Sequence, residues 1–238
     1  MKANEFLKNL ERSSNPLFSL SDLLKILGKD ENYAKVFLNR IVKRKMLIKI
    51  GKGRYALPNQ NPFSIASTII FPSYISFISA YSFYGLTTQI PRTIFVLSLK
   101  QKKGIAYNDY KIEFVKIAKE RFFGYKRDFF ENKIVFIAEV EKAVLDSLFL
   151  PRYCPIPETF FTLKGMEINM EKLLSYLKKF NSAIVAKRLG YLLDLTGVDI
   201  YDEVKPLLNK NYDLLNPLKP KTKEKNKKWK IIVNEVLE

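Results

Sequence analysis

Residues 18–57 decide the fold of the N-terminal part of the chain: FSLSDLLKILGKDENYAKVFLNRIVKRKMLIKIGKGRYAL. Apolar residues recur at helical spacing over residues 19–27 and again over residues 31–45. A basic hairpin pattern follows at once over residues 47–57, with its reversal at Gly51-Lys52-Gly53. Two helices followed by a two-stranded flap are typical of a winged helix-turn-helix, whose second helix enters the major groove of DNA.

The second predicted helix has an apolar and a polar side. We expect a small core to form from Ala34, Phe37, Leu38, Ile41 and Leu47 together with Leu20, Leu23, Leu24 and Ile26. Asp30 can cap this helix, and a helix start that points at phosphates would add a favourable dipole. Lys and Arg can neutralise phosphates or pair with guanine, Asn can pair with adenine, and Tyr can touch a thymine methyl group. The predicted DNA-binding residues are Asn32, Tyr33, Lys35, Asn39, Arg40, Lys43 and Arg44 on the helix and Lys49, Lys52 and Arg54 on the hairpin.

The composition favours a polyanionic partner and removes several kinds of site. The chain has 41 Lys and Arg against 24 Asp and Glu, and residues 1–60 alone hold 13 basic and 5 acidic side chains. One cysteine, Cys154, excludes an intramolecular disulfide and a cysteine-rich zinc site, and the absence of histidine removes the commonest general base. This removes many hydrolase mechanisms. We expect a protein that is not an enzyme and that has no catalytic residue, metal or cofactor.

A membrane location is not expected. The sequence has no run of about 18 uninterrupted apolar residues. Residues 1–5 lack the apolar segment of a signal peptide. The sequence therefore predicts a cytoplasmic protein.

The chain divides into three predicted regions of an α+β protein. The winged helix-turn-helix covers residues 1–57 and ends at the proline-containing segment 58–62. A central mixed α/β domain covers residues 62–163, and a mainly helical region covers residues 164–238 and packs on it. The expected central elements are a helix capped by Ser73 and ending at Gly85, strands at 93–99, 110–117 and 133–137, and a helix at 139–148. The expected C-terminal helices are 170–180, 182–193 and 202–208.

Other interpretations of the body have weaker support. Glu139, Glu141 and Asp146, with Asp128 and Glu131, could hold Mg²⁺ for a nucleic-acid enzyme. However, Glu139 and Glu141 would point to different faces of a helix, and Glu141 to Lys142 with Asp146 is more typical of surface pairing and capping. Arg188 to Tyr191 is more typical of helix packing than of a phosphate site, and Trp229 of a core. The lysines between 219 and 228 could contact nucleic acid or an acidic partner, or form a solvated loop.

Four stretches of the chain, in order, resemble the AbiEi family of antitoxins of type IV toxin–antitoxin systems. The first two are Gly53-Arg54-Tyr55-Ala56-Leu57-Pro58 and Pro72-Ser73-Tyr74-Ile75-Ser76, the latter continuing through Ser79-Ala80 to Tyr84-Gly85-Leu86. The third is Phe123-Gly124-Tyr125 with Ala138, Glu141-Lys142-Ala143 and Leu145-Asp146. The fourth joins Arg188-Leu189-Gly190-Tyr191-Leu192-Leu193 to Leu215-Asn216-Pro217 and Lys228-Trp229-Lys230-Ile231-Ile232-Val233-Asn234.

The resemblance implies a protein with two activities. Its N-terminal domain would bind inverted repeats of double-stranded DNA in its own promoter and repress the operon, as a monomer or dimer on DNA. The remainder would neutralise a nucleotidyltransferase-like toxin, through residues that the sequence does not identify. Two departures from the family pattern lie in the body, where lysines between 219 and 228 replace an expected glycine and Val140 replaces a small polar residue. A winged-helix scaffold that binds protein or RNA is the alternative.

Overall fold

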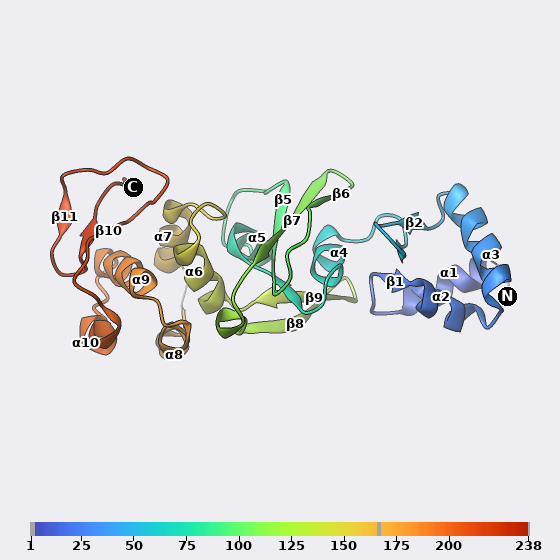
Figure 1. Ribbon diagram of the computed structural model, residues 1–238, viewed down its shortest axis with the longest axis horizontal. Helices are drawn as coiled ribbons and strands as arrows, with labels where there is room; N and C mark the ends of the chain where they lie inside the picture. The colour runs from blue at the N-terminus through green and yellow to red at the C-terminus, as the bar shows by residue number, and fades with distance from the viewer. Residues whose placement is uncertain (1–2, 166–167, 238) are drawn as a thin grey trace.

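A computed structural model of the protein describes residues 3–165 and 168–237. The chain is mixed α+β, and its parts lie in a row (Figure 1). Residues 3–57, here called the head, occupy one end, and the remaining described residues, here called the body, extend from a central sheet to a mainly helical end. Within the described ranges, no helix is long and apolar enough to span a membrane.

The head consists of three helices and a small antiparallel sheet of order β1-β3-β2. Its elements are α1 (Ala3–Arg12), β1 (Phe18–Ser19), α2 (Leu20–Leu27), α3 (Glu31–Lys43), β2 (Ile48–Lys49) and β3 (Arg54–Ala56). Ser19 and Asp22 form a reciprocal capping box at the start of α2, and Gly28 ends this helix in the left-handed conformation with φ 59°. The predictions for residues 19–27 and 31–45 therefore hold to within two residues. Helix α1 and strand β1 were not predicted.

The body is built on a six-stranded mixed sheet of order β6-β7-β5-β4-β9-β8. Its elements are α4 (Pro62–Thr68), β4 (Ser73–Ile75), α5 (Phe77–Phe83), β5 (Thr93–Ser98), β6 (Ile105–Tyr107), β7 (Tyr110–Lys116), η1 (Lys119–Arg121), β8 (Tyr125–Phe130), β9 (Lys133–Ala138), α6 (Val140–Phe149) and α7 (Ile156–Gly165). Helix α4 packs against β4, β5 and β9, and α6 connects the sheet to α5, α7, α8 and α9. The three predicted strands are present as β5, β7 and β9.

The prediction of one helix from Ser73 to Gly85 was wrong. Residues Ser73–Ile75 form a strand that pairs with β5 on one side and β9 on the other, and the helix starts only at Phe77. All three strand residues are buried, as both faces of this central strand are covered. Ser76, rather than Ser73, occupies the N-cap position.

The C-terminal end is less helical than expected. Its elements are α8 (Met170–Phe180), α9 (Ala183–Leu195), α10 (Tyr201–Val204), η2 (Lys205–Leu207), β10 (Asp213–Leu214), β11 (Lys225–Asn226) and β12 (Ile231–Ile232), and the strands form a sheet of order β10-β12-β11. The helix expected over 202–208 is broken, because Pro206 has no N–H to continue an α-helix.

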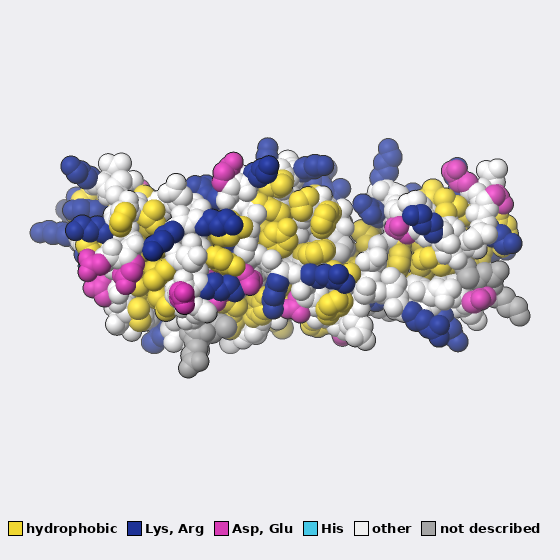
Figure 2. All heavy atoms as spheres, turned by 90° about the horizontal axis from the view of Figure 1, so that it is seen from below, with side chains coloured by type: hydrophobic (Ala, Val, Ile, Leu, Met, Phe, Trp, Pro, Cys, Tyr) yellow, Lys and Arg dark blue, Asp and Glu magenta, His cyan; other side chains and the backbone are white. Residues whose placement is uncertain are grey.

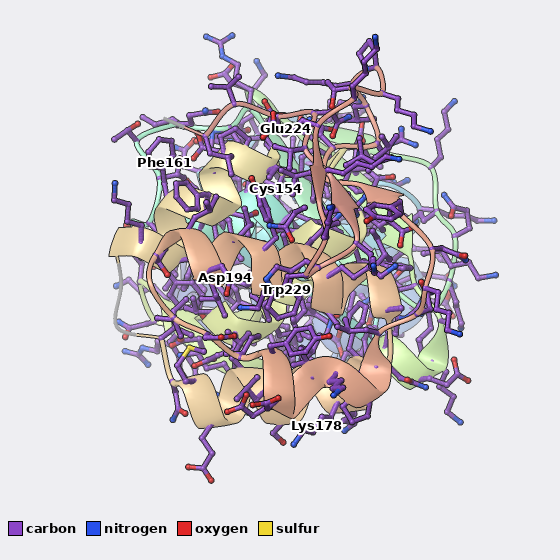
Figure 3. All side chains as sticks on the ribbon, turned by 90° about the vertical axis from the view of Figure 1, so that its left-hand side faces the viewer. Cys154, Phe161, Lys178, Asp194, Glu224 and Trp229 are labelled. Atoms are coloured by element: carbon purple, nitrogen blue, oxygen red, sulfur yellow. The ribbon has the colours of Figure 1, made fainter. Side chains whose placement is uncertain are left out.

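Trp229 closes the core at this end, as predicted. Its indole is fully buried and donates a hydrogen bond from Nε1 to Asp194 Oδ2 at 2.6 Å (Figure 3). A Cβ atom at Gly190 would lie 2.1 Å from the Trp229 ring, so this position of α9 accepts no side chain.

Head and body share a continuous contact. Leu17, Ile50 and Ala56 of the head belong to the large apolar core of the body, although the head also has a core of its own. Lys133 Nζ donates to the carbonyl oxygens of Leu10, Glu11 and Ser13 at 3.5, 2.9 and 2.6 Å, and so covers the C-terminal end of α1. Segment 58–61 therefore joins two parts that are already packed together.

Candidate nucleic-acid interface

Helix α3 separates its apolar and polar residues as the sequence predicts. Ala34, Phe37, Leu38 and Ile41 are buried, and the Phe37 ring meets the Phe6 ring edge-on at 5.3 Å between centroids. The helix begins because Asp30 Oδ1 accepts the Tyr33 N–H at 2.9 Å. The opposite face is thus held outwards by a packed core.

The solvent face of α3 carries the predicted residues. All ten candidates, on the helix and on the hairpin, are exposed: Asn32, Tyr33, Lys35, Asn39, Arg40, Lys43, Arg44, Lys49, Lys52 and Arg54. Among them the Tyr33 side chain is 45% exposed, and the neighbouring apolar side chain of Val36 is 61% exposed. A face that combines cations, an amide and small apolar surfaces is chemically suited to base edges and phosphates.

The N-terminus of α3 is less suited to phosphate than expected. The Asp30 carboxylate already accepts a backbone N–H there, and Glu31 forms an ion pair with Lys35 at 2.7 Å. Both carboxylates would repel a phosphate, so the expected dipole contribution is opposed by negative charge. The cationic part of the helix is its second half, where Arg40, Lys43 and Arg44 have no salt bridge to any described residue.

The hairpin after α3 presents three cations around a tight reversal. Gly51 and Gly53 adopt φ values of 68° and 66°, which favour glycine, and Ile50 N–H donates to Arg54 O at 2.8 Å. The predicted two-stranded flap gains a third strand, because β1 pairs with β3 through Phe18 opposite Tyr55. The turn therefore projects from a small sheet that is anchored to the head.

The carboxylate of Asp146, considered above as a metal ligand, is bound by other side chains of the protein. Its carboxylate contacts the Lys142 ammonium and accepts hydrogen bonds from Ser76 Oγ at 2.8 Å and Tyr74 OH at 3.4 Å. Lys142 and Asp146 are both fully buried, so the prediction of surface pairing was wrong. Burial raises the pKa of Asp146 and lowers the pKa of Lys142. In the structure Lys142 and Asp146 lie four residues apart on α6 and form an internal ion pair.

The expectation that Glu139 and Glu141 face different ways was also wrong. Both carboxylates reach the Lys172 ammonium, at 2.7 and 3.4 Å. Glu139 occupies the N-cap position with extended backbone, so helical spacing does not apply to it. Burial would raise the pKa of Glu139, but hydrogen bonds from Lys172 and Tyr176 bring it below the usual value. In the described ranges, no group of three or more carboxylate or cysteine side chains could hold a metal ion.

Arg188 serves packing, as expected, and does not form a phosphate site. Its guanidinium is buried and donates to the carbonyl oxygens of Leu148 at 2.6 Å and Leu214 at 3.0 Å. Burial lowers the pKa of this side chain to about 10. It therefore joins α6, α9 and β10.

Besides the burial of Lys142, sequence reasoning missed two further buried lysines. Lys133 contacts the end of α1, and Lys187 donates to Asn209 Oδ1, Asn211 O and Asp213 Oδ2 at 2.5 to 2.6 Å. For Lys187, the only sequence signal is its position inside the apolar stretch Ala183–Leu195. Its acceptors lie more than 20 residues away, so local spacing could not identify them.

No protein-family model matches the chain, and no curated protein matches it either.

Proposed function

We propose that the head is a winged helix-turn-helix that binds double-stranded DNA. One observation carries the proposal: a helix anchored by a core on one side exposes Asn39, Arg40 and Lys43 on the other, and a basic glycine hairpin follows it within a few residues. A helix that is merely solvated does not require a basic hairpin next to it, whereas a winged helix-turn-helix does.

Helix α3 would enter the major groove with its second half closest to the bases. Arg40 can donate two hydrogen bonds to guanine, and Asn39 can pair with adenine. Val36 and Tyr33 can contact thymine methyl groups. Lys49, Lys52 and Arg54 on the hairpin would neutralise phosphates of the adjoining backbone.

We further propose that the protein is a cytoplasmic antitoxin that represses its own operon. The support is the ordered resemblance of its sequence to AbiEi antitoxins, which covers head and body. Inverted promoter repeats would receive one head each, and the body would neutralise a nucleotidyltransferase-like toxin. The buried state of Asp146 and the Lys172 contacts of Glu139 and Glu141 give the rival, a Mg²⁺-dependent enzyme, no support.

The DNA proposal is tested by changing Lys35, Asn39 and Arg40 together to Ala. Binding to a duplex of the promoter repeat, followed by fluorescence anisotropy, should weaken at least a hundredfold, since each lost base or phosphate contact costs about 1–3 kcal/mol. The matched control is Gln101→Ala, Lys102→Ala and Lys103→Ala, which removes the same charge and one amide from an exposed segment of the body. This control should bind like the wild type.

The salt dependence distinguishes the partner class. If about five phosphates are neutralised, the logarithm of the affinity should fall with the logarithm of salt concentration at a slope of about −4 to −5. Equal affinity for RNA, or binding that ignores salt, would favour the scaffold alternative. Toxin neutralisation should persist when Lys35, Asn39 and Arg40 are changed to Ala. It should be lost when the body is deleted.

A further inference from the structure

Strand β8 is an open edge of the central sheet. It ends the order β6-β7-β5-β4-β9-β8 and pairs through Tyr125 to Phe130 with β9 alone. The other edge, β6, has three residues, whereas β8 has six and contains neither glycine nor proline. Native proteins usually shorten, charge or cover such an edge, because its free backbone groups pair with another strand.

The hairpin geometry shows which backbone groups of β8 point away from β9. Glu131 and Asn132 have φ values of 47° and 62°, as in a two-residue turn of type I′. The flanking residue Phe130 therefore bonds to β9, and alternate residues point the other way. The hydrogen bond of the Phe129 N–H is consistent with this pattern, because this N–H donates to Oδ1 of its neighbour Asp128 at 2.8 Å and not to β9. Tyr125, Arg127 and Phe129 thus direct their N–H and C=O groups away from the sheet.

Exposed aromatic side chains lie beside this edge. Phe129 is 53% and Phe71 is 71% exposed, and the Phe71 ring lies 5.7 Å from that of Phe136 on β9. The guanidinium carbon (Cζ) of Arg127 lies over the Phe129 ring, 5.1 Å from the ring centroid. In Figure 1 β8 forms the lower border of the centre, and Figure 2, seen from below, shows hydrophobic side chains there among lysines and arginines.

We propose that β8 pairs antiparallel with β8 of a second copy of this chain, about a twofold axis at Arg127. This register places all three outward-facing residues in hydrogen-bonded positions, and the Phe129 N–H exchanges its bond to Asp128 Oδ1 for one to the second copy. It places Lys126 opposite Asp128 of the second copy, and Tyr125 opposite Phe129, twice each. Lys126 and Asp128 already contact each other at 2.8 Å within one strand, so the four charges form an alternating network.

Neighbouring registers are less favourable. An axis at Lys126 or Asp128 would place identical charges opposite each other and leave one outward-facing residue of the strand without a partner. The chosen register brings two Arg127 side chains together, but each guanidinium has the face of its own Phe129 ring. The charges of β8 are complementary to those of a second, antiparallel β8. This self-complementarity favours a second copy of the chain over a strand of another protein.

The test measures the mass of the full chain without DNA, by sedimentation or light scattering over a concentration series. The wild type should approach twice 27.8 kDa as its concentration rises. Lys126→Asp should remain monomeric, because four carboxylates would then face one another. Lys126→Asp with Asp128→Lys should restore the dimer, because the reversed charges are again complementary.

A matched control uses the similarly spaced ion pair Lys111–Glu113 on the internal strand β7. Lys111→Asp, alone or with Glu113→Lys, should dimerise like the wild type. Arg127→Pro removes an outward N–H that β9 does not use, and should also give a monomer with an unchanged circular dichroism spectrum.

A monomeric wild type, or a Lys126→Asp dimer, would overturn the proposal. Failure of the charge reversal to restore the dimer would overturn the register. Because no DNA is present, these outcomes do not depend on the proposed DNA binding.

Discussion

Lysines of the head and lysines of the body have opposite environments. Lys43, Lys49 and Lys52 of the head are exposed and have no salt bridge to any described residue. Lys142 and Lys187 of the body are fully buried, and their ammonium groups are surrounded by acceptors. The net charge of +17 therefore overestimates the positive charge that is available on the surface to bind a polyanion. A lysine indicates a binding surface only where the fold leaves its ammonium group without internal acceptors.

The most enclosed of these lysines is Lys142. Its ammonium lies 5.0 to 5.5 Å from the ring centroids of Tyr74, Phe123 and Phe180, besides its contact with Asp146. Gly124 contributes to this enclosure, because a Cβ there would lie 2.8 Å from the Tyr176 ring and 3.0 Å from Lys142 Cβ.

The largest effect should follow from Lys142→Met. This change leaves the Asp146 charge buried without its cation, so we expect the free energy of unfolding to fall by about 3–5 kcal/mol in urea denaturation. Lys35→Met in the head, the matched control, should change stability by at most about 1 kcal/mol because its ion pair is exposed. Adding Asp146→Leu to Lys142→Met should recover most of the loss. Equal effects of the two single changes would contradict the contrast between head and body.

A smaller effect is expected at Lys133, which joins the two parts. Lys133→Met leaves carbonyl groups at the end of α1 without a donor, which should cost about 1–3 kcal/mol. The loss should appear first in the head, as faster proteolysis of residues 3–57, while the body melts at its usual temperature. Lys111→Met, on an exposed site of β7, serves as control. Uniform destabilisation of head and body would contradict the expected local effect of Lys133 on the head.

The smallest effect concerns Lys172, which is intermediate between the two groups at 32% side-chain exposure. The pKa of its partner Glu139 is lowered in the folded protein, so the carboxylate stabilises the fold above pH 4.5, and this contribution disappears as the pH falls through the folded value. Glu139→Gln should therefore reduce stability by about 0.5–1 kcal/mol at pH 7 and by less at pH 3. Thermal melting of both proteins across this pH range measures the difference, and a constant difference would contradict it.

Local sequence patterns correctly predicted those helices and faces that are determined by residues within the same segment. Helix 170–180 was predicted at its observed bounds from apolar residues at helical spacing, and the structure shows Asn169 and Asn181 at its two caps. The outward face of α3 was likewise predicted, since one stripe of apolar residues determines the buried side.

Elements and sites that depend on distant residues were missed. Strand β8, with the sequence YKRDFF, lacks an alternation of apolar and polar residues, and only its pairing with β9 makes it a strand. Ser73–Ile75 becomes a strand because β5 and β9 lie on either side. Lys142 and Asp146 have the spacing of an exposed ion pair, and only the aromatic rings of Tyr74, Phe123 and Phe180 make the pair internal.

The fit of Trp229 against Gly190 has a consequence for the order of events during synthesis. Gly190 of helix α9 is synthesised about 40 residues before Trp229. Until then the side of α9 at Gly190 has no apolar cover, and Asp194 lacks its indole donor. The C-terminal end can therefore fold around α9 only after translation has passed residue 229, and nascent chains stalled before that point should be substrates for chaperones and proteases.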